Sequence, residues 1–172
     1  IVGCQSTVIP NSVTKIGRNA FSSCTYLTEL TFPDSITEIP GYIFEECVAL
    51  NKVTIPNSIT YIGEEAFYSC TNLTSLTLPN SIVEIDSRAF LSCSNLTDIN
   101  LPNSIVRIGS YAFQGVGFSE IVIPHLVTEI EDGLFWMCTN LKKITLPDSI
   151  TKIGERTFYN CGLNEITIPS YV

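Results

Sequence analysis

The sequence has little charge and few of the side chains on which catalytic sites are built. Of its 172 residues only 15% are charged, compared with about a quarter in a typical soluble domain, and one is a histidine. Nine basic residues and 17 acidic residues give a net charge of -8. Nucleic acids and anionic membranes attract concentrated Lys and Arg, so we expect neither as a partner.

Long apolar runs are also missing. No stretch approaches the roughly 18 residues of a membrane span, and no basic and then apolar leader opens the chain, so we expect no direct membrane insertion. The sequence starts inside a repeat without an initiating Met, and we therefore expect a segment of a longer protein, with more repeats of the same chain at the ends. The 45% hydrophobic content predicts a folded core.

A proline recurs every 23 residues, with two intervals of 22 residues. These prolines are Pro10, Pro33, Pro56, Pro79, Pro102, Pro124, Pro147 and Pro169. Each short interval lacks one residue beside a glycine, Gly117 or Gly162, and we expect glycine there because it tolerates positive φ. The period predicts one solenoid domain over residues 1–172, with partial repeats at both ends and seven repeats at 10–32, 33–55, 56–78, 79–101, 102–123, 124–146 and 147–168.

The apolar positions of the repeat are filled in every unit. The aromatic column contains Phe21, Phe44, Phe67, Phe90, Phe113, Phe135 and Phe158. Alternation before each proline, as in residues 76–78, predicts a strand that pairs with the equivalent strand of the next coil in a parallel sheet. Proline lacks a backbone donor and ends each strand. Residues 63–70 are too few for an independent helix, and we expect one or two helical turns there.

This repeat resembles the BspA-like leucine-rich repeat family, whose consensus is similar to LxxLxLPxSLxxIGxxAFxxC, over essentially the whole chain. The resemblance implies a leucine-rich repeat solenoid, a right-handed coil with a parallel β-sheet on the concave face and short strands, turns or helical turns elsewhere. Members of the family are cell-surface and secreted proteins for which adhesion is the usual role. The family pattern names core positions, so it assigns no functional residue to this chain.

Cysteine forms the one column that could suggest metal or disulfide chemistry. Its members are Cys24, Cys47, Cys70, Cys93, Cys138 and Cys161, while Val116 occupies the remaining position and Cys4 lies outside the register. No CxxC pair is present, so we expect no metal site and no cofactor. Replacement by Val indicates small, buried, unpaired thiols. With no acid, base or nucleophile brought together by a motif, we expect no enzyme.

Two outward columns of the predicted sheet form the favoured binding surface, on the concave face, because a partner can select only among outward positions. The proposed residues are Glu29, Thr31, Lys52, Thr54, Ser75, Thr77, Asp98, Asn100, Glu120, Lys143, Thr145 and Glu165. The threonines are equally well explained as β-branched strand residues.

An aromatic edge is the rival surface, because aromatic anchors concentrate binding energy and the concave face has none. Its candidates are Tyr68, Trp136 and Tyr159, just after the Phe column, with Trp136 beside Met137 in the most divergent unit. A third column, on the strand after the proline, places opposite charges on neighbouring rungs, as in Glu84 and Arg107, and predicts ion pairs between rungs.

Two functions remain open from the sequence. The first is an adhesin-like module of a cell-surface or secreted protein that binds another protein or a glycan. The alternative is a cytoplasmic structural scaffold or assembly component built on the same solenoid, which the unpaired thiols favour because they suit a reducing compartment.

Overall fold

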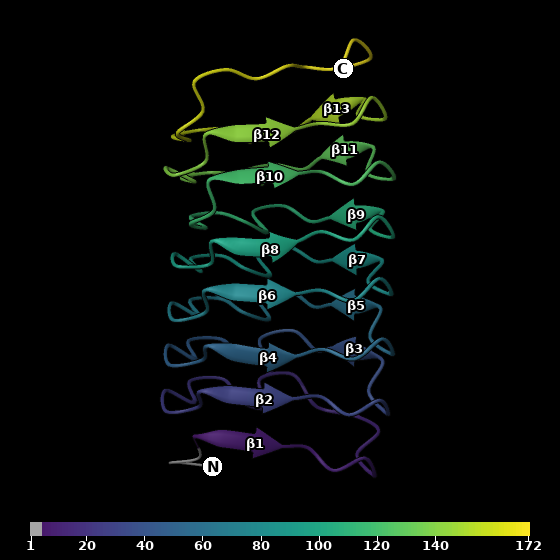
Figure 1. The fold of residues 1–172 in the computed structure, drawn as a ribbon, viewed down its shortest axis with the longest axis vertical. Coiled ribbons are helices and arrows are strands. Elements are labelled where there is room, and N and C mark those ends of the chain that lie inside the picture. The colour runs from purple at the N-terminus through teal and green to yellow at the C-terminus, as the bar shows by residue number, and fades with distance from the viewer. Residues whose placement is uncertain (1–4) are drawn as a thin grey trace.

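The computed structural model describes residues 5–172, which form a stack of rungs along one axis (Figure 1). Each complete rung has a three-residue strand and, after the proline, a two-residue strand. The longer strands are β1 (Ser6–Val8), β2 (Glu29–Thr31), β4 (Lys52–Thr54), β6 (Ser75–Thr77), β8 (Asp98–Asn100), β10 (Glu120–Val122) and β12 (Lys143–Thr145). The shorter strands are β3 (Glu38–Ile39), β5 (Tyr61–Ile62), β7 (Glu84–Ile85), β9 (Arg107–Ile108), β11 (Glu129–Ile130) and β13 (Lys152–Ile153). The predicted solenoid is confirmed.

The longer strands form the main sheet, and their outward side chains form what we call the main face. Pairing is parallel and joins equivalent positions of successive rungs, as Glu29 joins Lys52. The paired groups are β1-β2-β4, β6-β8 and β10-β12. The main ladder is therefore interrupted between β4 and β6 and between β8 and β10, whereas the sequence predicts pairing at every rung.

The shorter strands form a second sheet on another side of the coil, and we call its outward surface the second face. Strands β3, β5, β7 and β9 pair continuously, and β11 pairs with β13. The continuous ladder crosses the rungs at which β4 and β6 separate. The second sheet therefore holds these two rungs together although their main strands do not pair.

Tandem turns, and not helical turns, close the third side of the coil, so the expectation of helix at residues 63–70 is wrong. Glu65 and Ser69 have φ angles of 52° and 57°, which is the left-handed region. The amide of Tyr68 bonds three residues back to the Glu65 carbonyl at 3.1 Å, while the Phe67 amide bonds to Ala89 of the next rung at 2.8 Å. Alternate amides thus serve the neighbouring rung, which removes them from helical bonding.

The core is a set of stacked columns inside the coil. Phe67 and Phe90 stack with ring centroids 5.1 Å apart, and Phe113 and Phe135 stack at 6.1 Å. The column phenylalanines from Phe44 to Phe135 are fully buried. The aromatic column predicted from the sequence is confirmed, and burial of this apolar surface is the main force that holds the rungs together.

The two short rungs depend on glycine for a reason that differs from the one we expected. Neither Gly117 nor Gly162 has a positive φ. A Cβ on Gly117 would overlap the carbonyl oxygen of Ser94 in the preceding rung, and a Cβ on Gly162 would overlap that of Thr139. Glycine is required there because the backbones of successive rungs approach closely.

A ladder of serine hydroxyls, which the sequence analysis did not anticipate, links the rungs beside the second sheet. Ser58 donates to the Ile36 carbonyl at 2.7 Å, and Ser104 donates to the Ile82 carbonyl at 2.6 Å. Leu126 replaces the serine in one rung, where its side chain is 46% exposed. Among residues 5–172, the structure has no helix of the length and apolar character needed to cross a membrane.

Candidate functional site

The structure places most of the predicted binding residues together on the main face. All the predicted positions from Glu29 to Thr145 lie on the longer strands and are exposed. Period-two alternation explains this placement, because the residue between each pair, such as Leu30 or Leu76, faces the core. Glu165 is also exposed, but it lies in the segment after β13, where no strand is formed. The main face is therefore a mostly polar surface over β2 to β12, interrupted by Val122 of β10, which is 64% exposed.

The charged side chains on the main face do not form ion pairs with one another. Within residues 5–172, none of the six charged binding candidates makes an ion pair, although Glu29 and Lys52 occupy paired positions, as do Glu120 and Lys143. These six residues are Glu29, Lys52, Asp98, Glu120, Lys143 and Glu165. Their charges are free to meet those of a partner.

The second face differs because its charges are used internally. Arg107 contacts Glu84 at 2.5 Å, and Lys152 contacts Glu129 at 3.2 Å. The predicted pairing of neighbouring rungs is confirmed for these two pairs. Lys15, which the sequence places in the same column, lies outside the strands and makes no ion pair with a described residue.

Asn100 is bound by the fold. Its side-chain oxygen accepts from the Leu78 amide at 2.9 Å, and its side-chain nitrogen donates to the Leu78 carbonyl at 3.1 Å. These two hydrogen bonds to the backbone of Leu78 take the place of the strand-to-strand hydrogen bonds at the end of β6. The fold therefore occupies both polar atoms of the Asn100 side chain.

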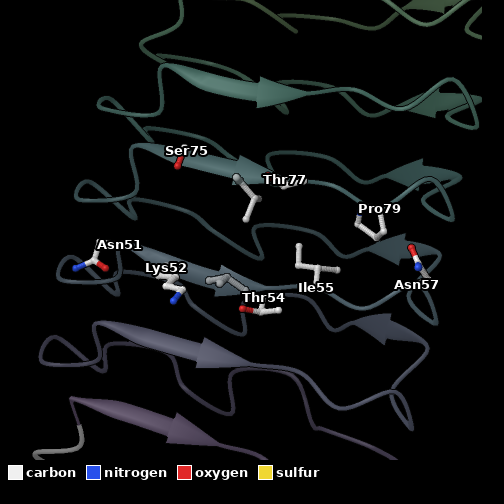
Figure 2. Close-up of a pocket in the computed structure, with 10 residues that line it drawn as sticks. Asn51, Lys52, Thr54, Ile55, Asn57, Ser75, Thr77 and Pro79 are labelled. Carbon is white, nitrogen blue, oxygen red and sulfur yellow. The ribbon is translucent and has the colours of Figure 1, made fainter.

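Grooves open on the main face within residues 5–172, and three of them lie where the pairing of the longer strands stops. The first groove, about 490 Å³, lies between β4 and β6 and is lined by residues 51–55, Asn57, residues 75–77 and Pro79 (Figure 2). The second groove, about 520 Å³, lies between β8 and β10 and is lined by residues 97–101, Asn103, residues 119–122 and Pro124. The third groove, about 700 Å³, lies beyond β12 and is lined by residues 142–146, Asp148, residues 165–167 and Pro169.

The first groove has polar walls and an apolar floor. Figure 2 shows Lys52 and Thr54 on one strand and Ser75 and Thr77 on the next. Val53 is half-buried there, whereas the equivalent Leu30 of β2, the strand that pairs on both sides, is buried. The interruption of the ladder thus exposes part of the core, which gives a ligand both hydrogen-bonding groups and apolar surface.

The aromatic edge brings together only two of its three predicted residues. Trp136 and Tyr159 meet edge to face with centroids 5.8 Å apart, while Tyr68 makes no aromatic contact within residues 5–172. The structure adds Tyr111, 5.8 Å from Trp136, and Arg156, whose guanidinium lies 5.6 Å from the Trp136 ring centroid. Tyr111 and Arg156 each stand two residues before the column phenylalanine of their own rung, in the position that Gly133 occupies in the rung between them, and this shared position is the signal in the sequence.

Glycine at position 133 makes room for this cluster. Its φ is 60°, and a Cβ there would overlap the Tyr111 ring. The buried indole nitrogen of Trp136 has no hydrogen-bond partner. Part of the cluster's surface is therefore occupied by contacts within the fold.

The cysteine column is a ladder of free thiols, which are buried in its middle and half-buried at its two ends, Cys24 and Cys161. Cys93 donates to the Phe67 carbonyl at 3.0 Å, and Cys138 donates to the Phe113 carbonyl at 3.0 Å. Burial raises the pKa of each of these two thiols to about 12, so they remain protonated and poor nucleophiles at neutral pH. No cluster of three His, Cys, Asp or Glu suited to a metal ion occurs in residues 5–172, and Cys4 lies outside the described residues.

Comparison with known proteins identifies the same repeat. A family model described as BspA type leucine rich repeat region matches six copies, over residues 3–117 and 65–172. A leucine-rich repeat protein of T. pallidum shares 30% identity and a TM-score of 0.81, covering 87% of this chain and 73% of that protein. No curated protein gives a significant match.

Two more distant structures share the fold. A leucine-rich repeat protein from Bacteroides ovatus ATCC 8483 is 21% identical with a TM-score of 0.53, covering 96% of this chain and 67% of that protein. Another from Eubacterium ventriosum ATCC 27560 is 19% identical with a TM-score of 0.61, covering 98% of this chain and 45% of that protein.

Proposed function

Because the chain belongs to the BspA type leucine-rich repeat family, we propose that it is a binding module of an adhesin-like protein, with no catalytic site of its own. The whole protein is proposed to be secreted or held at the cell surface, where adhesion is the usual role of proteins that resemble it. Its partner is another protein or a glycan. The main face is the proposed binding surface.

The observation that carries this proposal is the difference between the two sheet faces. On the second face, Arg107 and Lys152 each pair with a carboxylate of a neighbouring rung. On the main face, exposed charges such as Lys52 and Lys143 make no ion pair. Charges that the fold leaves unpaired select a partner by complementarity at little cost to stability.

The grooves add apolar surface to these charges. Their volumes, about 490 Å³ and 520 Å³ for the first two, are within the range of sites that bind small ligands. Several grooves on one face allow a long partner to bind at more than one place, which raises the overall affinity without a new kind of contact.

Binding of matched variants to extracellular matrix and to intact cell surfaces tests the proposal. Lys52→Glu changes the main face, and Lys152→Glu makes the same change of charge on the second face. We expect the Lys52 variant to weaken binding and the Lys152 variant to bind like the unmodified chain, provided that both have native circular dichroism. Binding at background level by the unmodified chain, or equal loss in both variants, would refute the proposed surface.

The second candidate function is an intracellular scaffold, and the free thiols favour it. All six described cysteines are unpaired. Unpaired thiols are usual in a reducing compartment, although burial protects four of these six from oxidation anywhere. Mass spectrometry of the native protein from its own cells separates the two functions: a cleaved leader and surface neighbours support the adhesin, and an unprocessed chain crosslinked to cytoplasmic proteins supports the scaffold.

A further inference from the structure

Both sheets are interrupted at the same junction of the stack. Strands β8 and β10 do not pair on the main face, and β9 and β11 do not pair on the second face. The junction between β4 and β6 differs, because β5 pairs with β7 across it. Figure 1 shows a wider step from β8 to β10 than from β10 to β12, and from β9 to β11 than from β11 to β13. We call the boundary between the rung of β8 and β9 and the rung of β10 and β11 the open junction.

Backbone hydrogen bonds that join other rungs are missing at the open junction. On the second face, the Thr151 amide donates to the Thr128 carbonyl of the preceding rung at 2.9 Å. The Thr128 amide holds the same position one rung earlier, yet within residues 5–172 no backbone hydrogen bond joins residues 97–108 to residues 119–131. Two of the three sides of the coil therefore carry no backbone ladder across this junction.

The ladder of serine hydroxyls is broken at the same place. Ser149 donates to the Val127 carbonyl of the preceding rung at 2.7 Å, whereas Leu126 holds the equivalent position at the open junction and has no donor. An ion pair between Arg107 and Glu131, at 3.7 Å, does cross the junction. Both of its side chains are partly exposed, and ion pairs of this kind contribute little to stability. The second face is therefore held only weakly here.

The third side of the coil, formed by the tandem turns, stays bonded across the open junction. The Phe113 amide donates to the Leu134 carbonyl at 3.1 Å, and the Gly115 amide donates to the Trp136 carbonyl at 2.8 Å. The Tyr111 and Trp136 rings meet across the same two rungs, with centroids 5.8 Å apart. The aromatic edge therefore lies on the side at which the two rungs remain joined.

Phe118 fills the core at the open junction. It takes the position that Leu96 and Leu141 hold in the neighbouring rungs, and it is 1% exposed. Its ring meets Phe113 edge to face with centroids 5.7 Å apart, and Phe135 at 6.2 Å. Apolar contact is not directional, whereas a hydrogen bond weakens steeply as its angle departs from linearity. Contacts of this kind therefore allow a tilt that a hydrogen-bonded ladder resists.

We infer that the open junction is a hinge, about which two blocks of the solenoid tilt with the tandem turns as the pivot. The first block contains the rungs up to β9, and the second contains the rungs from β10 onward. Ladders within each block hold it together, β7 with β9 in the first and β11 with β13 in the second. Tilting changes the angle between β8 and β10, so the main face consists of two parts that move relative to each other. This inference goes beyond the proposed function and does not depend on which partner the main face binds.

Distances between two spin labels on the full chain test the hinge. The labels are attached to introduced p-acetylphenylalanine, so the native thiols stay unlabelled. One pair replaces Lys52 and Lys143 and spans four junctions that include the open one, and the matched pair replaces Ser6 and Asp98 and spans the four junctions before it. Double electron–electron resonance is expected to give a broader distance distribution for the first pair. Equal widths for the two pairs would overturn the inference.

Leu126→Ser tests the cause of the tilt. Its hydroxyl is placed to donate to the Ile105 carbonyl, as that of Ser149 does to the Val127 carbonyl, which adds one hydrogen bond across the open junction. We expect this variant to narrow the distance distribution across the junction. Leu126→Ala removes the same side chain without supplying a donor, and is expected to leave the distribution as broad as in the unmodified chain. The same width in both variants would contradict the hinge.

Hydrogen exchange followed by NMR distinguishes a tilt from complete separation of the rungs. The Thr128 amide is expected to exchange faster than the Thr151 amide, which holds the same position at a paired junction, while the Phe113 amide on the pivot stays protected. Loss of protection at Phe113 would show that the rungs separate on every side. Protection of Thr128 equal to that of Thr151 would show a closed ladder, and either result would refute the hinge.

Discussion

Gly133 shows how a single residue permits a cluster on the edge of the coil. Its left-handed backbone and missing Cβ leave space for the Tyr111 ring, which in turn contacts Trp136. We expect Gly133→Ala to reduce the free energy of unfolding by about 2 to 4 kcal/mol, through a strained φ and a steric overlap. Denaturant unfolding measures this loss.

A double-mutant cycle separates the two causes. In a Tyr111→Ala background the overlap is gone, so the cost of Gly133→Ala is expected to fall to about 1 to 2 kcal/mol, the cost of the left-handed backbone alone. The same cost in both backgrounds would show that the Tyr111 ring does not depend on Gly133.

At the scale of single residues, the sequence predicts which side of the sheet a side chain faces better than it predicts which groups the side chain contacts. Period-two alternation correctly places Lys52 outward and Leu76 inward. It does not predict that Asn100 binds the Leu78 backbone, because that bond depends on the local ending of the ladder. Nor does it give the role of Gly117, since a close approach between rungs leaves no mark on local spacing.

The buried thiols of the cysteine column make the stability of the fold depend on pH. Burial raises the pKa of Cys47, Cys93 and Cys138 to about 12, above the ordinary thiol value of 9.0. Above about pH 9 the unfolded chain therefore releases protons that the folded chain retains, and stability falls as the pH rises. Each thiol is expected to remove up to about 1.4 kcal/mol per pH unit until about pH 12.

Urea unfolding at several pH values tests this dependence, with Cys93→Val as the control. Val116 already occupies the same column, so Val fits the position. The variant is expected to show a smaller loss of stability between pH 9 and pH 11, by the share of one thiol. An unchanged slope would mean that the buried thiol does not contribute to the pH dependence.

The ladder of serine hydroxyls is interrupted at Leu126, and this interruption can be tested. Leu126→Ser places a hydroxyl where other rungs bond the preceding rung's carbonyl, and we expect about 1 kcal/mol of added stability. Ser104→Ala removes the corresponding hydroxyl from another rung and is expected to lower the stability by about 1 kcal/mol. Thermal unfolding of both variants measures the effect, and destabilisation by Leu126→Ser would contradict the role assigned to the ladder.

The sequence predicts the strands of each rung but not the form of its third side. Residues 63–70 contain good helix formers such as Ala66, which favours helical turns. The fold instead uses alternate amides, such as that of Phe67, to bond the next rung. This choice depends on the stacked neighbour, so no local pattern reveals it.

At the scale of the whole molecule, the repeated sequence predicts the stack of rungs but does not show where the pairing of the longer strands is interrupted. Each unit carries nearly the same residues, yet β4 and β6 separate while β6 and β8 pair. The grooves arise from this difference between rungs, which near-identical repeats do not encode in any obvious way. The boundaries of the seven repeats stay a prediction.

The natural lysines offer the most direct test of the main face as the binding surface. Lys52 and Lys143 lie on the main face, Lys152 lies on the second face, and all three are exposed. Lysine crosslinking of the chain to a partner captured on cell surfaces or matrix, read by mass spectrometry, is expected to join that partner to Lys52 and Lys143. Crosslinks confined to Lys152, with the main-face lysines unmodified by the partner, would contradict the account.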